Sequence, residues 1–258
     1  MTVWVEGYPQ SHVDVADPGL LVFEYVQHLA ACLDVLPAGP PPRALAVTHV
    51  GGAGLTLPRY VEHTRPGSTQ IVLEPDEALT TLVRRTLPWS RRHRIRVRGV
   101  DGARGLSGLR DASADAVVLD AFSGGQVPAE LTTTQWFTGV SRVLRPGGLL
   151  LLNLTDEPGL RYVARVAAGV RAVLAGSLVL VATRDVSKGR RFGNVVLAAS
   201  DATLDTAALR RRIAANPFPT ELRDGVQLRP LLAGMRPFTA ADAAASPVPP
   251  APGRWRIR

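Results

Sequence analysis

The sequence predicts an α/β protein built on a mostly parallel, seven-stranded sheet with helices on both faces. From residue 43 onward, short apolar runs alternate with helix-like stretches of about ten residues. A glycine cluster, "HVGGAGLT", follows the first run, and acidic residues follow the later ones. Alternation of this kind is typical of parallel sheets, because each crossover between parallel strands needs a helix-length connection.

Residues 1–42 are expected to form a small extension ahead of the sheet. The first 20 residues have an extended character, and Asp17 is placed to cap a helix that starts near Pro18. Apolar residues then recur every three or four positions through "LLVFEYVQHLAACLDVL", as on the buried face of a helix. The proline-rich connector at 37–42, "PAGPPP", ends that helix.

Residues 43–235 are predicted to form the main domain. Its first five strands are "RALAVTHV", "QIVLEPD", "RIRVRGV", "ADAVVLDAF" and "GLLLLNL". The runs "SLVLVAT" and "GNVVLAAS" are expected to pair as an antiparallel hairpin, which completes seven strands. A helix, "LDTAALRRRIAAN", comes next, and the proline-rich tail at 236–258 is expected to lie over the surface.

Composition limits the classes of protein to consider. Of the 258 residues, 46% are hydrophobic and 20% charged, which is ordinary for a folded domain. The net charge of +8 comes almost entirely from arginine, a skew that coding bias explains, so nucleic acid is not an expected partner. With no signal-peptide pattern and no apolar run near the ~20 residues that span a bilayer, a cytoplasmic protein without membrane contact is expected. The single cysteine, Cys32, is expected to be buried, and five scattered histidines predict no metal site.

The glycine cluster indicates a nucleotide-binding turn. Gly51, Gly52 and Gly54 allow the backbone to turn tightly and to approach a ligand where a Cβ atom would collide. The dinucleotide pattern needs a further glycine three positions after Gly54, and that position is Leu57. A nicotinamide cofactor is therefore disfavoured, and a glycine turn without a ligand is the alternative.

Acidic residues follow the next three strands, at the edge where ligands bind in such sheets. Glu74 lies 20 residues after Gly54, the separation at which a carboxylate accepts hydrogen bonds from ribose hydroxyls. Asp101, followed by Gly102, either accepts a hydrogen bond from an adenine amine or belongs to an Asp-Gly turn. Asp120 follows three apolar residues and precedes a glycine-containing loop, and it is the best catalytic candidate.

In this order the motifs resemble those of the class I S-adenosylmethionine-dependent transferases, and more narrowly those of the spermidine synthase family. The segments that carry the resemblance are "PQSHVDVADPGLLVFEYVQHL", "HVGGAGLTLPRYV", "VLEPD", "VDGAR", "VVLDAFSGGQVPAELTTTQWF", "VLRPGGLLLLNL" and "KGRRFGNVVLAAS". The resemblance implies a Rossmann-like class I methyltransferase fold. It also implies that the cofactor is S-adenosylmethionine or its decarboxylated form, without a metal, that the acceptor is an amine or another small molecule, and that the chain forms a homodimer, as relatives commonly do.

The resemblance further implies roles for individual residues. Asp120 matches the catalytic aspartate, which contacts the cofactor and helps to deprotonate and orient the acceptor amine. Glu74 would hold the ribose, Asp101 the adenine, and the glycines the amino-acid end of the cofactor. The full set of cofactor-binding positions is Gln10, Gly51, Gly52, Gly54, Glu74, Asp101, Gly102 and Asp120.

The acceptor region departs from the pattern of the polyamine synthases. Relatives carry a second aspartate where this chain has Ser123, and a loop aspartate where it has Ala53. Their Tyr-His-Glu sequence is matched only by "FEYVQH".

The predicted function is a spermidine synthase-like transferase that passes an aminopropyl group to an amine. A small-molecule methyltransferase and a non-catalytic nucleoside-binding homologue are the alternatives.

Overall fold

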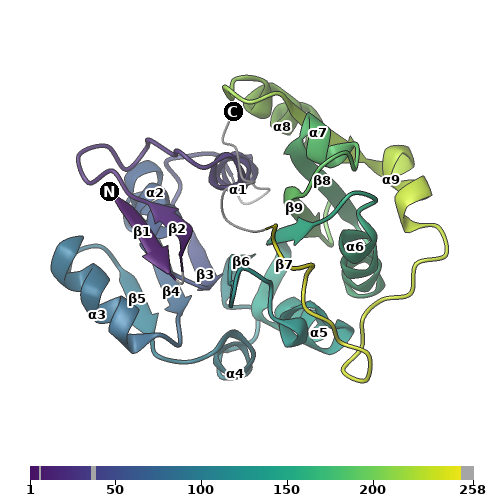
Figure 1. Cartoon of the computed structure of the whole chain (residues 1–258). Helices are drawn as coiled ribbons and strands as arrows, with labels where there is room; N and C mark the ends of the chain where they lie inside the picture. The colour runs from purple at the N-terminus through teal and green to yellow at the C-terminus, as the bar shows by residue number, and fades with distance from the viewer. Residues whose placement is uncertain (6, 36–38, 251–258) are drawn as a thin grey trace.

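The computed structural model describes residues 1–5, 7–35 and 39–250, and its main feature is an eight-stranded sheet (Figure 1). The strand order is β10-β8-β9-β7-β6-β3-β4-β5. The strands are β3 (Ala46–Val50), β4 (Thr69–Leu73), β5 (Ile95–Arg98), β6 (Ala114–Leu119), β7 (Leu144–Asp156), β8 (Ser177–Thr183), β9 (Gly193–Ser200) and β10 (Thr220–Asp224). Strands β3 to β7 are parallel, β9 runs antiparallel to β7 and β8, and β10 runs antiparallel to β8.

The order of the strands reverses between β3 and β6. From β3 the chain moves outward through β4 and β5, and it then returns to the other side of β3 to form β6 and β7. Ligands of open α/β sheets bind at such a switch point, beyond the carboxyl ends of the strands. The glycine loop 51–54 follows β3 and Asp120 follows β6, so both lie at this point.

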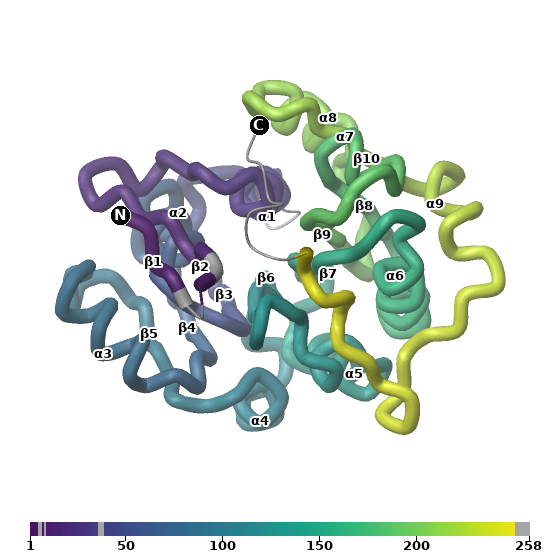
Figure 2. Tube along the Cα trace, in the orientation of Figure 1, coloured from purple at the N-terminus to yellow at the C-terminus, as the bar shows by residue number. Residues whose placement is uncertain are grey.

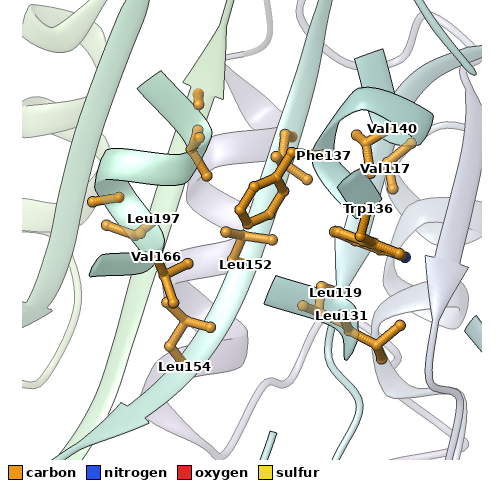
Figure 3. Packing of buried hydrophobic residues seen from close by; sticks show 14 of the residues in the cluster. Val117, Leu119, Leu131, Trp136, Phe137, Val140, Leu152, Leu154, Val166 and Leu197 are labelled. Carbon is orange, nitrogen blue, oxygen red and sulfur yellow. The ribbon is translucent and has the colours of Figure 1, made fainter. Parts of the chain in front are cut away.

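Helices cover both faces of the sheet through separate clusters of buried apolar side chains. One face carries α1 (Glu24–Asp34), α2 (Thr56–Thr64), α3 (Glu77–Thr86) and α8 (Thr206–Ala214). The other carries α4 (Gly102–Ser107), α5 (Thr134–Val143), α6 (Arg161–Val173) and α9 (Gly225–Leu232). In Figure 3, Phe137 of α5 and Val166 of α6 pack with Leu152 of β7. A short 3₁₀ turn, η1 (Ala129–Thr132), precedes α5, and α7 (Arg184–Ser187) joins β8 to β9.

A small antiparallel hairpin, β1 (Thr2–Val5) and β2 (Tyr8–His12), lies against the glycine loop. The Gly54 amide donates to Ser11 Oγ at 3.1 Å, and Thr56 Oγ1 donates to the His12 carbonyl at 2.9 Å. A Cβ atom on Gly54 would lie 2.9 Å from the Ser11 Cβ. The hairpin therefore seats closely on the loop because residue 54 is a glycine.

The chain after α9 packs against the sheet rather than lying loosely over the surface. In Figure 2 it passes along α5 toward the end of β7. Phe238 and Ser246 are buried, and Ser246 bonds to Val127 in the loop after β6 and to Thr155 in β7. Residues 37–38 of the predicted connector and 251–258 of the predicted tail lie outside the described residues.

The α/β fold class and the β8–β9 hairpin are confirmed, and two details are corrected. The sheet has eight strands, because the charged edge segment "TELRD" pairs with β8 as β10. Helix α1 begins at Glu24, not near Pro18, because the Asp17 carboxylate accepts the Gly19 amide at 3.0 Å and forms a local turn. Cys32 is buried, as expected. No helix within the described ranges is long and apolar enough to cross a membrane.

Candidate active site at the switch point

Gly51 follows β3 directly and contacts the ends of the two neighbouring strands, β4 and β6. Its backbone φ is +91°, and its amide donates to the Leu73 carbonyl of β4 at 2.9 Å. A Cβ atom there would lie 2.2 Å from the Asp120 carbonyl oxygen, well inside contact distance. Only glycine fits this position, because both the backbone conformation and the closeness of the Asp120 backbone exclude a side chain.

Glu74 fixes the conformation of the glycine loop. Its Oε2 accepts from the Gly52 amide at 2.9 Å and from the Ala53 amide at 3.2 Å, while Oε1 accepts from the Asp76 amide at 3.0 Å. A carboxylate has about four acceptor positions, so backbone amides use most of its capacity. The sequence predicted a ribose-binding carboxylate at Glu74. In the structure this carboxylate holds the glycine loop, and its binding of ribose stays a prediction.

The Asp120 carboxylate is the first of three hydrogen-bonded side chains that lead from the end of β6 across β7 to β9. Asn153 Nδ2 on β7 donates to Asp120 Oδ1 at 2.8 Å, and Asn194 Nδ2 on β9 donates to Asn153 Oδ1 at 3.0 Å. Asn153 is fully buried, so its orientation is fixed by these two bonds. Burial raises the pKa of Asp120 to about 6, and the hydrogen bond from Asn153 works in the opposite direction.

A narrow pocket opens between the glycine loop, α1 and the ends of β3 and β6. It encloses about 30 Å³, room for one or two water molecules. Its lining residues are Gln10, Ser11, Tyr25, Val26, His49, Gly51, Gly52, Ala53, Thr56, Leu57, Pro58, Val118 and Asp120. The pocket therefore brings the N-terminal hairpin, helix α1 and the catalytic candidate to one place.

Four of the predicted positions, Gln10, Gly51, Gly52 and Asp120, line this pocket, whereas the others lie outside it. The exposed Asp101 caps α4, because its Oδ1 accepts the Arg104 amide at 2.8 Å. A Cβ atom on Gly102 would lie 2.3 Å from Val50 Cγ1, so Gly102 has a packing role. Gly54 contacts the hairpin, and Glu74 stands beside the loop at the end of β4.

Sequence reasoning missed three polar residues of the site. Tyr25 donates its hydroxyl to the Gln10 carbonyl at 3.3 Å; burial first, and then the charge of Asp120, raise its pKa well above the usual value. His49 lies on β3 just before the glycine loop, and Asn153 interrupts the apolar run "LLLLNL". A polar residue within a buried strand is the signal that could have identified the last two, since buried polar groups need partners.

Within the described part of the chain, no group of three or more His, Cys, Asp or Glu side chains could hold a metal ion. The charged side chains of the site are the carboxylates of Asp120 and Glu74. Asp120 and Glu74 are both half-buried at the carboxyl edge of the sheet.

The fold and the position of the site define a class of protein: a class I methyltransferase fold with a glycine loop at its switch point. No family model matches the chain. A probable spermidine synthase from Corynebacterium glutamicum superposes with a TM-score of 0.85 and 28% identity, covering 92% of this chain and 88% of the other. Human methyltransferase-like protein 13, in complex with S-adenosylhomocysteine, superposes with a TM-score of 0.57 and 22% identity, over 85% of this chain and 96% of that one.

A curated relative agrees with the first of these structures. The polyamine aminopropyltransferase of Vibrio vulnificus is 24% identical over 131 residues, which are 50% of this chain and 43% of the relative. The match thus spans less than half of that relative's length. Taken together, the comparisons show that the chain has the class I methyltransferase fold and is similar to spermidine synthases, the resemblance that the sequence predicts.

Proposed function

We propose that this chain binds a nucleoside of the S-adenosylmethionine type and transfers an aminopropyl group from it to a small amine. One observation carries the proposal: Asp120 is the single charged side chain among the described residues that line the pocket at the switch point. The names of the two spermidine synthase-like relatives support the same reaction.

The strand order gives the direction in which the nucleoside would lie. Asp101 follows β5, Glu74 follows β4, and the glycine loop follows β3, with Asp120 next to it on β6. With adenine near Asp101 and ribose near Glu74, the sulfonium and its side chain reach the loop and the pocket beside Asp120. The acceptor would enter from the same side, because Asp120 is the group placed to receive its proton.

The chemistry requires a carboxylate that accepts a proton close to neutral pH. The acceptor nitrogen forms a bond to the carbon beside the sulfonium, the carbon–sulfur bond breaks, and its electron pair stays on sulfur, which leaves methylthioadenosine. The proton that the nitrogen loses passes to Asp120. With a pKa of about 6, Asp120 is mostly ionised at pH 7 and is well matched to this task. Asn153 holds the carboxylate in place.

The charges in the pocket favour the decarboxylated donor over S-adenosylmethionine itself. No arginine or lysine is among the described lining residues, and the Gly52 and Ala53 amides already donate to Glu74. The methionine end of S-adenosylmethionine carries a carboxylate beside its ammonium group, and that carboxylate would meet the like charge of Asp120 with no arginine or lysine of the pocket to pair with it. The decarboxylated side chain ends in an ammonium group, whose charge is opposite to that of Asp120.

Mass spectrometry of nucleoside products tests the proposal. The protein is incubated with each donor and a panel of amines that includes putrescine. We expect methylthioadenosine from the decarboxylated donor, and no turnover with the Asp120→Asn variant. S-adenosylhomocysteine as the product would establish the methyltransferase alternative, which the likeness to methyltransferase-like protein 13 supports at the level of fold. Calorimetry that detects binding of neither nucleoside would reject both.

A further inference from the structure

His49 is a buried histidine in the wall of the pocket that the proposed reaction leaves without a role. It lies on β3, is 3% exposed, and is one of the residues that line the pocket, together with Tyr25 and Asp120. Its Nε2 lies 2.8 Å from Gln70 Oε1, and Gln70 Nε2 donates to the Pro58 carbonyl at 2.9 Å.

This pair of contacts determines which ring nitrogen carries the proton. The Pro58 carbonyl can only accept, so the NH₂ group of Gln70 faces it and the Gln70 oxygen faces His49. His49 must therefore donate from Nε2, and Nδ1 keeps its lone pair. Burial lowers the pKa of His49 to about 4, so the ring is neutral near pH 7.

The Nδ1 lone pair has no hydrogen-bond partner among the residues that the structure describes. An unpaired acceptor that borders a pocket is suited to a ligand that brings a donor. The pocket volume of about 30 Å³ suits a group the size of a water molecule, and an ammonium group is of that size.

We propose that His49 determines donor specificity by accepting, at Nδ1, a hydrogen bond from the terminal ammonium group of the donor's side chain. The inference rests on the proposed function, which brings that side chain to the β3–β6 end of the site. The loop residue Ala53 offers no side-chain acceptor there, so a neutral acceptor from the strand below takes that part. His49 thus directs the ammonium group without adding a charge, and Asp120 provides the charge.

Calorimetry with two thioether nucleosides and two variants tests the role of His49. S-adenosylthiopropylamine carries the terminal amine, and methylthioadenosine lacks it. In His49→Gln the amide replaces the Nε2 position and leaves Nδ1 without a substitute, whereas in His49→Asn the amide replaces the Nδ1 position. A hydrogen bond to a charged group predicts a loss of about ten- to a hundredfold in the affinity of His49→Gln for the amine-bearing nucleoside. Its affinity for methylthioadenosine should not change, and His49→Asn should recover most of the loss.

An equal loss for both nucleosides, or no loss for either, would show that His49 serves the fold alone and would overturn the inference. Nitrogen-15 NMR of the wild-type protein gives the same answer without a variant. The Nδ1 resonance should move when S-adenosylthiopropylamine binds and stay in place with methylthioadenosine, and an unmoved resonance with both overturns the inference. Wild-type protein that binds neither nucleoside would instead overturn the proposed function, and the inference with it.

Discussion

Replacing Asn153 by leucine should raise the pKa of Asp120. The substitution keeps the number and branching of the side-chain heavy atoms but removes the 2.8 Å hydrogen bond that favours the ionised carboxylate. A hydrogen bond to a charged group contributes about 1.5–3 kcal/mol, and one pKa unit corresponds to about 1.4 kcal/mol. The expected rise is therefore about one to two units, from about 6 to between about 7 and 8.

The consequence for activity depends on pH. At pH 7 roughly nine-tenths of the wild-type Asp120 is ionised, and in Asn153→Leu this fraction falls to between roughly a half and a tenth. The acidic limb of the pH profile of kcat/KM should move upward by the same one to two units, with activity recovered above about pH 8.5. Carbon-13 NMR of the Asp120 carboxyl group measures the same shift without turnover.

Asn194→Ala is the matched control, because it leaves the bond between Asn153 and Asp120 in place. Its effect on the Asp120 pKa should be well below one unit. An Asp120 pKa that stays near 6 in Asn153→Leu would refute the reasoning, since it would mean that solvent replaces the lost donor. A fall in the pKa would show that burial is not the dominant influence.

The remaining predictions concern stability and binding. Asp120→Asn should raise the melting temperature at pH 8 but not at pH 4: the wild-type carboxyl has a pKa raised from 3.8 to about 6, so its ionisation destabilises the fold as pH rises through that window, by at most about 3 kcal/mol. Gly51→Ala should destabilise the protein by several kcal/mol in urea unfolding, whereas Gly67→Ala, at φ +81° in open space, should cost only about 1–2 kcal/mol; equal losses would contradict the clash with Asp120. Glu74→Ala should weaken binding of methylthioadenosine on the order of ten- to a hundredfold in calorimetry, and unchanged affinity would remove Glu74 from the binding site. Ser246→Ala leaves the buried Val127 amide without its acceptor and should cost about 1–3 kcal/mol, with faster hydrogen exchange at that amide as the specific sign.

Much of the fold could be predicted from local patterns. Strands buried on both faces are short apolar runs, and β6 and β7 were identified for that reason. Strand β10 was missed because an edge strand with charged side chains has no apolar pattern. The start of α1 was placed too early because Asp17, a good helix cap, is equally good at closing a turn.

The site, like the fold, has a part that the sequence predicts and a part that it does not. Glu74 and Asp120 were found because their positions relative to strand ends can be counted along the chain. The contacts between Asn153 and Asp120, and between His49 and Gln70, join residues 33 and 21 positions apart. Which side chains meet across neighbouring strands depends on strand order and register, and a single sequence does not state either.

The contacts of Ser246 have a consequence for the order in which the protein is made. Chains fold from the N-terminus as they leave the ribosome, and every strand of the sheet is translated before residue 246. The loop after Asp120 receives its Ser246 partner late, so a growing chain can form the strands of the sheet before this loop gains that contact. A chain truncated at residue 235 would then resemble the finished protein in its sheet and differ from it beside Asp120.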